Sequence, residues 1–237
     1  MSNENSVTDT DRAVAQPTPE PVDWEAQIGQ TIRNTAEQDS HVERDAVTFH
    51  PSQLAKCKRQ ATLAKFGLKE FDTDTLGTFR AGTLVHEWIQ AELADQFPNC
   101  EFEREIQETY TNPVNGEEIR VTGRADLWNP EQGIVYDFKT RGGWYNFNPP
   151  TDRHLDQLTL YMDALDAEAG QIIYINRKNL EIRPWPADTT YPFDADRRAK
   201  LLQKARAIRD GIRGAGRISS KSDVPFEDCG CWLCGQE

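Results

Sequence analysis

The sequence predicts an α/β fold in which helices pack on a single mixed β-sheet. Apolar residues recur at helical spacing in four segments, and over three consecutive short segments they alternate with polar residues, which indicates strands. The order helices, three strands, helix, strand favours a sandwich of helices around one sheet. Three of its strands are expected to form an antiparallel meander.

Residues 1–45 are predicted to form a disordered acidic tail, and residues 46–237 a single domain. The tail contains three prolines and carries ten acidic and three basic residues, a net charge of −7. Such a composition buries too little apolar surface to offset the entropy cost of ordering. The whole chain has a net charge of −12, so residues 46–237 carry only −5. The acidic balance therefore does not exclude a nucleic-acid partner.

Two helices are predicted at the start of the domain. The first has Ser52 as its N-cap and ends at Gly67, and the second spans residues 76–97 approximately. The apolar side of the second helix consists of Leu84, Val85, Trp88, Ile89 and Leu93.

The meander is predicted from residues 103–110, 118–128 and 133–140. Asn115-Gly116 joins the first two strands and residues 129–132 join the last two, and both connections are typical of hairpins.

The remaining elements follow two breaks, Gly142-Gly143 and Pro149-Pro150. We predict a helix over residues 152–166, a buried strand over 171–176 and a short extended segment over 181–185. Asp194 is the expected N-cap of a last long helix. That helix has an apolar face with Leu201, Ile208, Ile212 and Ala215, and an opposite face with Arg198, Arg206, Arg209, Arg213 and Arg217.

Two strands of the meander are expected to bring acidic residues and a lysine together. Asp126 lies on the second strand, and Asp137 and Lys139 lie on the third. Adjacent antiparallel strands hold opposite side chains within a few ångströms of each other. Because side chains alternate along a strand, Asp137 and Lys139 share one face while Phe138 points toward the core.

Two carboxylates and a lysine suit phosphodiester hydrolysis. Carboxylate oxygens bind Mg²⁺ or Mn²⁺, which lowers the pKa of a bound water, and a neighbouring ammonium group orients that water. An Asp-x-Lys triplet is a short motif, and a solvated salt bridge on an exposed strand face is the alternative interpretation.

Further motifs surround this triplet. In chain order they are Gly82-x-x-x-His86, Asp126, Asp137-x-Lys139 and Gln157-x-x-x-Tyr161. This order resembles the RecB-like branch of the PD-(D/E)xK nucleases, and the resemblance covers the chain from His50 to the C-terminus. It implies the nuclease core fold and DNA as the substrate.

The resemblance also implies roles for individual residues. His86, Asp126, Asp137 and the backbone carbonyl of Phe138 would bind the metal ion. Asp126, Asp137 and Lys139 would form the catalytic centre, where Lys139 positions or activates the attacking water.

DNA would be positioned by residues outside the metal site. The resemblance assigns this role to Gln157 and Tyr161. Arg124, Arg141 and the arginine face of the last helix are further candidates for phosphate contacts, and ordinary solvation is the alternative for each of them.

Five cysteines occur, and three of them form the cluster Cys229-Gly-Cys231-Trp-Leu-Cys234 near the C-terminus. No apolar run of about 18 residues and no secretory signal is present, so we expect a cytoplasmic protein without membrane contact. In that compartment, clustered cysteines indicate a metal site rather than disulfides. Cys100 lies apart from the cluster and is expected to be an ordinary small side chain.

Residues 52–67 resemble the first-cysteine helix of iron–sulfur nucleases, which include the CRISPR-associated exonuclease family and the AddB-type helicase-nucleases. The resemblance implies that Cys57 joins Cys229, Cys231 and Cys234 around a [4Fe-4S] cluster, which would act as a clasp between the two ends of the domain. The spacing C-x-C-x-x-C is tighter than in those families, and this leaves zinc open as an alternative.

The expected function is that of a Mg²⁺- or Mn²⁺-dependent exonuclease acting on single-stranded or frayed DNA, with a role in CRISPR spacer acquisition beside integrase proteins. A viral or plasmid nuclease used in recombination or replication is an alternative. A non-catalytic module that binds DNA or proteins is another, and so is a zinc-dependent DNA-recognition protein. The oligomeric state does not follow from the sequence.

Overall fold

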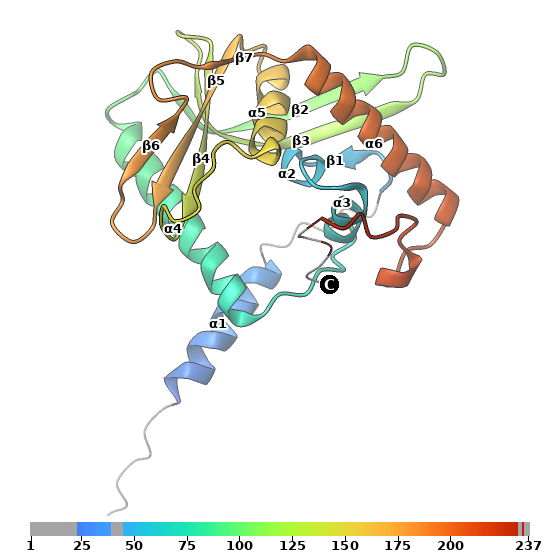
Figure 1. Ribbon diagram of the computed structural model, residues 1–237, viewed down its shortest axis with the longest axis horizontal. Coiled ribbons are helices and arrows are strands. Elements are labelled where there is room, and N and C mark those ends of the chain that lie inside the picture. Colours follow the sequence, from blue (N-terminus) through green and yellow to red (C-terminus); the bar gives the residue numbers. More distant parts are fainter. Residues whose placement is uncertain (1–22, 39–44, 232–233, 235–237) are drawn as a thin grey trace, which may run out of the picture.

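The computed structural model describes residues 23–38, 45–231 and 234, and it confirms the predicted mixed sheet flanked by helices (Figure 1). Within these residues, seven strands form one sheet. Its main path runs β1-β3-β4-β5-β6, with β2 paired to β3 and β7 paired to β5. The strands are β1 (Thr48–Phe49), β2 (Glu101–Thr111), β3 (Glu118–Asn129), β4 (Ile134–Arg141), β5 (Ala169–Asn176), β6 (Ile182–Trp185) and β7 (Tyr191–Pro192).

Helices cover both faces of this sheet. They are α1 (Trp24–Gln38), α2 (Pro51–Leu54), α3 (Lys58–Lys65), α4 (Thr73–Ala94), α5 (Asp152–Ala164) and α6 (Ala195–Ala215), followed by a 3₁₀ turn, η1 (Lys221–Asp223). The larger core lies between the sheet and α5 and α6, with fully buried residues that include Leu158, Ile172 and Ile208. A smaller core lies under α4 and contains Leu127, Phe138 and Ile175. No helix within the described ranges has the length and apolar character needed to cross a membrane.

The first predicted helix is in fact two short helices, α2 and α3. His50 rather than Ser52 is the N-cap of α2, and its ring nitrogen Nδ1 donates a 2.8 Å hydrogen bond to the carbonyl of Thr122 on β3. The helical run breaks after α2. Cys57 is the N-cap of α3, because its Sγ accepts a hydrogen bond from the backbone N–H of Gln60. The break turns the Cys57 thiol toward the C-terminal cysteines.

The predicted disordered tail contains a helix. Residues 24–38 form α1, which packs on the start of α4 (Figure 1). Gly29 is buried in this contact, and Arg33 donates a hydrogen bond to the hydroxyl of Thr73. Sequence composition missed this helix because its ordering depends on a partner that, at the Arg33–Thr73 hydrogen bond, lies 40 residues away along the chain. The other residues of the predicted tail, 1–22 and 39–44, lie outside the described ranges.

The apolar side of α4 is narrower than the sequence predicted. Val85, Ile89 and Leu93 pack on the smaller core. Leu84 and Trp88 are 50% and 48% exposed, so the prediction was wrong for these two residues. The reason is that α4 contacts the sheet along one stripe, and both residues lie beside it.

The C-terminal helix α6 begins as predicted, because the Asp194 carboxylate caps it by accepting from the backbone N–H of Arg197. Its expected apolar face is buried except at Ala215, which is exposed. On the expected arginine face, Arg213 and Arg217 are exposed. Arg209 is buried at 2% exposure and pairs with Glu117 at 2.6 Å, and Arg198 pairs with Asp163 at 2.9 Å. Arg209 and Arg198 thus neutralise carboxylates of the protein, which makes them less available for phosphate contacts.

Candidate functional site

The candidate site lies where β3 and β4 diverge. These two strands pair over only three Cα positions, from Leu127↔Tyr136 to Asn129↔Ile134. Beyond this short ladder, Asp126 bridges the gap, because its Oδ2 accepts a 2.6 Å hydrogen bond from the backbone N–H of Phe138. The fork therefore fixes one carboxylate of the site against the backbone of the neighbouring strand.

Asp137 and Lys139 lie on β4 and point to the same side of it. The Asp137 side chain is 1% exposed, and the Lys139 ammonium donates a 2.6 Å hydrogen bond to its Oδ1. The same nitrogen is 2.6 Å from Oδ2, but Oδ2 accepts no well-oriented hydrogen bond from any described residue. A buried carboxylate oxygen that lacks a hydrogen bond is a suitable ligand for a divalent cation.

Burial raises the pKa of Asp137 to about 6, because a charge on this carboxylate is poorly solvated. The ammonium of Lys139 lowers the pKa and the carboxylate of Asp126 raises it, and burial has the larger effect. The site thus contains an acid that loses its proton near neutral pH and has no access to water for charge stabilisation.

His86 approaches the fork from α4. Its Nδ1 lies 3.7 Å from Oδ1 of Asp126, and its ring contacts Phe138 edge to face at 6.0 Å between centroids. Gly82, one turn earlier, explains how the helix comes this close: a Cβ atom there would lie 2.8 Å from the hydroxyl of Thr140 on β4. The predicted Gly-x-x-x-His motif therefore combines a close helix–strand contact with an imidazole placed beside Asp126.

Gln157 and Tyr161 approach from α5 on the larger-core side. Gln157 Nε2 donates a 3.0 Å hydrogen bond to the Tyr161 hydroxyl. Tyr161 is 6% exposed, and its ring lies 3.7 Å from the place that a Cβ atom on Gly123 would occupy. Burial raises the pKa of Tyr161, and the negative charges of Asp137 and Asp126 raise it further. The pair is thus close enough to the two carboxylates to respond to their charge.

An open cavity of about 600 Å³ adjoins His86. Arg124, predicted as a DNA contact, lines it and is 57% exposed. Glu103 also lines it, and this residue was missed by sequence analysis. Its φ of 49° is in the left-handed region, where it interrupts the β2–β3 ladder opposite Asp126. Its carboxylate accepts a 2.6 Å hydrogen bond from Gln90 and lies 3.5 Å from Arg124, and no pattern in the run of glutamates on β2 distinguishes it.

Arg141, also predicted as a DNA contact, is engaged elsewhere. Its guanidinium donates hydrogen bonds to the carbonyls of Gly143 and Tyr145 in the loop that follows β4. It also lies 4.4 Å from the ring centroid of Phe147. This half-buried arginine therefore holds the loop.

The four cysteines expected to share a site are together. The ligand atoms of Cys57, Cys229, Cys231 and Cys234 all lie within 4.8 Å of one another. Sγ of Cys57 is 3.6 Å from that of Cys234 and 3.8 Å from that of Cys231. The arrangement joins the start of α3 to the C-terminal segment and can bind a metal ion or a cluster. Cys100 is separate and packs beside the smaller core.

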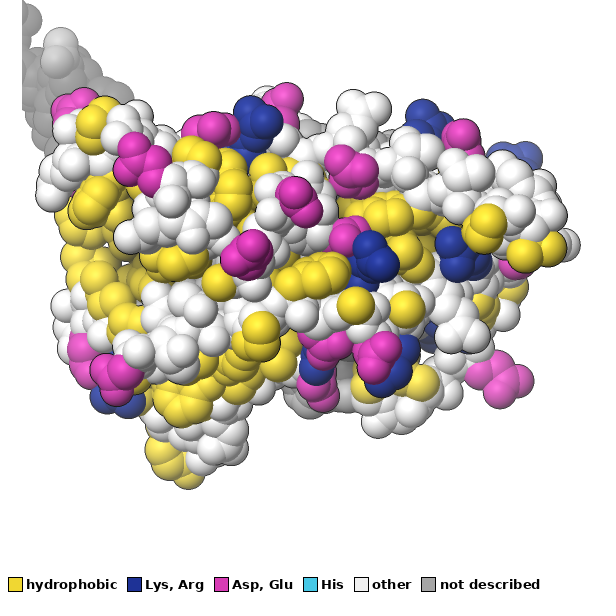
Figure 2. All heavy atoms as spheres, turned by 90° about the horizontal axis from the view of Figure 1, so that it is seen from above, with side chains coloured by type: hydrophobic (Ala, Val, Ile, Leu, Met, Phe, Trp, Pro, Cys, Tyr) yellow, Lys and Arg dark blue, Asp and Glu magenta, His cyan; other side chains and the backbone are white. Residues whose placement is uncertain are grey.

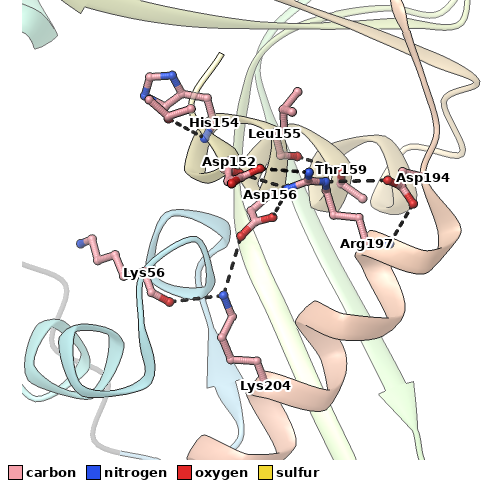
Figure 3. Close-up of polar contacts among 10 residues, drawn as sticks. Lys56, Asp152, His154, Leu155, Asp156, Thr159, Asp194, Arg197 and Lys204 are labelled. Carbon is pink, nitrogen blue, oxygen red and sulfur yellow. Dashed lines mark hydrogen bonds and ion pairs between the residues drawn. The ribbon is translucent and has the colours of Figure 1, made fainter. Parts of the chain in front are cut away.

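A polar network connects Lys56, the residue before Cys57, to α5 (Figure 3). Lys204 of α6 donates a hydrogen bond to the carbonyl of Lys56, the residue before Cys57, and lies 3.7 Å from the carboxylate of Asp156, the residue before Gln157. Arg197 holds the same carboxylate at 2.6 Å. The segments that carry the cluster and the Gln157–Tyr161 pair are thus joined through α6.

A family model described as the PD-(D/E)XK nuclease superfamily matches residues 91–235. Among solved structures, SSO0001 is 24% identical, with a TM-score of 0.58 over 76% of this chain and 85% of that chain. The alkaline exonuclease LHK-Exo of Laribacter hongkongensis is 12% identical, with a TM-score of 0.47 over 70% of this chain and 88% of that one. A phage-related exonuclease from Haemophilus somnus is 14% identical, with a TM-score of 0.41 over 69% and 92%. No curated protein matches the sequence.

Proposed function

The chain belongs to the PD-(D/E)XK nuclease superfamily, whose members use divalent metals, and on this premise we propose that it is a Mg²⁺- or Mn²⁺-dependent DNA exonuclease. Its substrate is single-stranded DNA or the frayed end of a duplex. The observation that carries the proposal is the convergence of His86, Asp126, Asp137 and Lys139 at the β3–β4 fork, with a buried oxygen of Asp137 available to a cation.

We assign the metal ligands to His86, Asp126, Asp137 and the backbone carbonyl of Phe138. The divalent cation supplies Lewis acidity toward the phosphate and the attacking water. The protein contributes a prearranged pair of carboxylates: the backbone of Phe138 orients Asp126, and burial withholds water from Asp137. Because the pKa of Asp137 is about 6, this carboxylate is ionised and ready to bind a cation above that pH.

Lys139 is the residue that orients the attacking water and stabilises negative charge on the phosphate. Its side chain is 19% exposed, so the ammonium can reach a substrate while remaining against Asp137. Gln157 and Tyr161 brace the site and position the strand, and Arg124 provides a phosphate contact from the cavity beside His86. Arg141 contributes indirectly to positioning the DNA strand, because it holds the loop that follows β4.

DNA recognition rests on such specific contacts more than on diffuse attraction. On the face of the molecule seen in Figure 2, Lys and Arg side chains lie singly among Asp and Glu side chains and do not form one basic patch. The net charge of −12 on the whole chain likewise gives no diffuse attraction to DNA phosphates.

The cysteine cluster holds a [4Fe-4S] centre that clasps the ends of the domain, residues 46–237, with zinc as the alternative. A cytoplasmic location suits reduced thiols. The combination of this clasp with a RecB-like nuclease core favours trimming of spacer precursors in CRISPR adaptation beside integrase proteins, and a viral or plasmid recombination nuclease would carry the same site.

Digestion of end-labelled single-stranded DNA with Mg²⁺, Mn²⁺ or EDTA tests the activity. Cleavage with either metal and none with EDTA is expected, and the ultraviolet–visible spectrum of anaerobically purified protein reports the cluster. Folded protein that binds DNA but leaves it intact with both metals would contradict the nuclease and favour a non-catalytic assembly module.

A further inference from the structure

The loop between β4 and α5 presents one aromatic side chain to solvent. Within residues 142–147, the Tyr145 side chain is 88% exposed. Its neighbours Trp144 and Phe147 are half-buried and in contact with each other, with 5.0 Å between ring centroids. Exposure of a single aromatic ring is common on protein surfaces. The construction of this loop distinguishes Tyr145 from such cases.

Three strands hold the loop in place. From β4, Arg141 donates to the carbonyls of Gly143 and Tyr145. From the region around β6, Arg183 stacks 4.2 Å from the ring centroid of Trp144, while Glu181 accepts a 2.6 Å hydrogen bond from the Trp144 indole N–H. From β5, Tyr174 contacts Phe147 edge to face at 4.9 Å. The aromatic neighbours Trp144 and Phe147 are thus fixed, and Tyr145 is the aromatic side chain of this loop that projects outward.

The loop is anchored beside β4, the strand that carries Asp137 and Lys139. Tyr174, which supports Phe147, is the Cα partner of Lys139 in the β4–β5 ladder, and adjacent strands lie about 4.8 Å apart. The opposite side of the loop adjoins the cavity near His86, because Arg177, which lines that cavity, also lies close to Gly142. A DNA strand whose phosphate reaches Lys139 would therefore pass this loop.

We propose that Tyr145 is a base-stacking platform that positions an unpaired base of the DNA strand next to the site of cleavage. This inference rests on the proposed nuclease function. An exposed ring on a braced loop loses little conformational entropy on binding, and a base in single-stranded DNA offers a π-face of matching size. The stacked base need not be of one type, so Tyr145 would favour single-stranded over fully paired DNA without selecting a sequence.

Single abasic sites in single-stranded oligonucleotides test the contact. In the presence of Ca²⁺, the abasic position is moved along the strand, and DNA affinity is measured for the wild type, Tyr145→Ala and Tyr145→Phe. We expect one position at which loss of the base weakens binding to wild type and to Tyr145→Phe by about 5- to 150-fold, the range that corresponds to one stacked base. The same abasic site should have almost no effect on Tyr145→Ala, because the ring and the base act as a pair.

Val114→Ala is the matched control, since Val114 is 91% exposed on the distant β2–β3 hairpin. It should retain the wild-type abasic profile. Metal-dependent cleavage of unmodified DNA is measured in parallel, so that failure of the nuclease proposal is recognised separately. If wild type cleaves single-stranded DNA but every abasic position has the same effect on wild type and Tyr145→Ala, Tyr145 does not stack on DNA and the inference is overturned.

Discussion

The ammonium nitrogen of Lys139 lies 2.6 Å from both carboxylate oxygens of Asp137, and it donates its hydrogen bond to only one of them. The two oxygens of the buried Asp137 carboxylate therefore differ. One accepts the hydrogen bond of the lysine, and the other has only the ion-pair contact with it. The pair therefore offers a charged ligand and a charged donor to the same small volume.

Replacing Asp137 with Asn should reduce metal-dependent DNA cleavage more than about 100-fold, because the variant loses the anionic ligand. The volume of the side chain is conserved, so the fold should be kept. Initial rates on end-labelled single-stranded DNA measure the effect, and Asp188→Asn, at an exposed loop position, is the control. Cleavage at the wild-type rate by Asp137→Asn would remove this carboxylate from the proposed site.

Asp137 should also make the metal-free protein less stable as pH rises. Its folded-state pKa of about 6 lies above the ordinary value of 3.8, so the folded state binds the proton more tightly than the unfolded state. Stability from this group is therefore fully present below pH 4 and is lost between pH 4 and 6. The loss amounts to about 3 kcal/mol above pH 6.

Urea unfolding in EDTA at pH 4.5 and pH 7 measures the larger part of this loss. Relative to wild type, Asp137→Asn should gain stability over that interval, because an amide does not ionise. A difference between the two proteins that is independent of pH would show that the carboxylate is not buried as described.

Lys139→Ala should lower turnover by about 100- to 10,000-fold while leaving DNA affinity nearly unchanged, since the ammonium acts on the attacking water and on charge that develops during the reaction. Loss of this ammonium should also raise the pKa of Asp137 further, because Lys139 lowers it. The acidic limb of the pH–rate profile is then expected to move to higher pH. Single-turnover kinetics and equilibrium binding distinguish the outcomes, with Lys178→Ala as the exposed control. Equal losses in affinity and turnover would make Lys139 a simple phosphate contact.

The sequence predicted the parts of this molecule that depend on local pattern. These parts are the three strands of the meander and the Asp194 cap, which were predicted from alternation and spacing. The joining of Cys57 to the distant C-terminal cysteines was predicted from the family resemblance. The parts that it missed depend on distant partners. Helix α1 is ordered against α4, and Arg209 is buried because Glu117 lies opposite it in space. Glu103 is distinguished only by its backbone conformation opposite Asp126, which no side-chain pattern encodes.

Ser substitutions at the four clustered cysteines should each remove the bound metal and destabilise the domain, because binding at a four-thiolate site is coupled to folding and contributes on the order of 10 kcal/mol. Cys100→Ser is the matched control and should keep both metal and stability, since Cys100 lies in a different part of the fold. Iron and zinc content and melting temperature across the five variants give the answer. Full metal content in Cys57→Ser would show that the early cysteine is not a ligand, and zinc in anaerobic wild type would replace the iron–sulfur assignment.

Replacing Lys204 tests whether α6 stabilises the cysteine clasp. The Lys204→Met change removes the hydrogen bond to the Lys56 carbonyl, whereas Asp156 keeps Arg197 at 2.6 Å, so the contact between α5 and α6 should survive. The weakened point is then the segment just before Cys57. We expect the free energy of unfolding to fall by about 1 to 3 kcal/mol, and metal release to a chelator to become faster. Turnover by the fully loaded enzyme should be unchanged, because Lys204 touches neither Asp126 nor Asp137.

Lys200→Met, at an exposed position one turn earlier on α6, controls for loss of a charge. If both variants release metal at the wild-type rate, the cysteine clasp is held by its own ligands and by α3 alone.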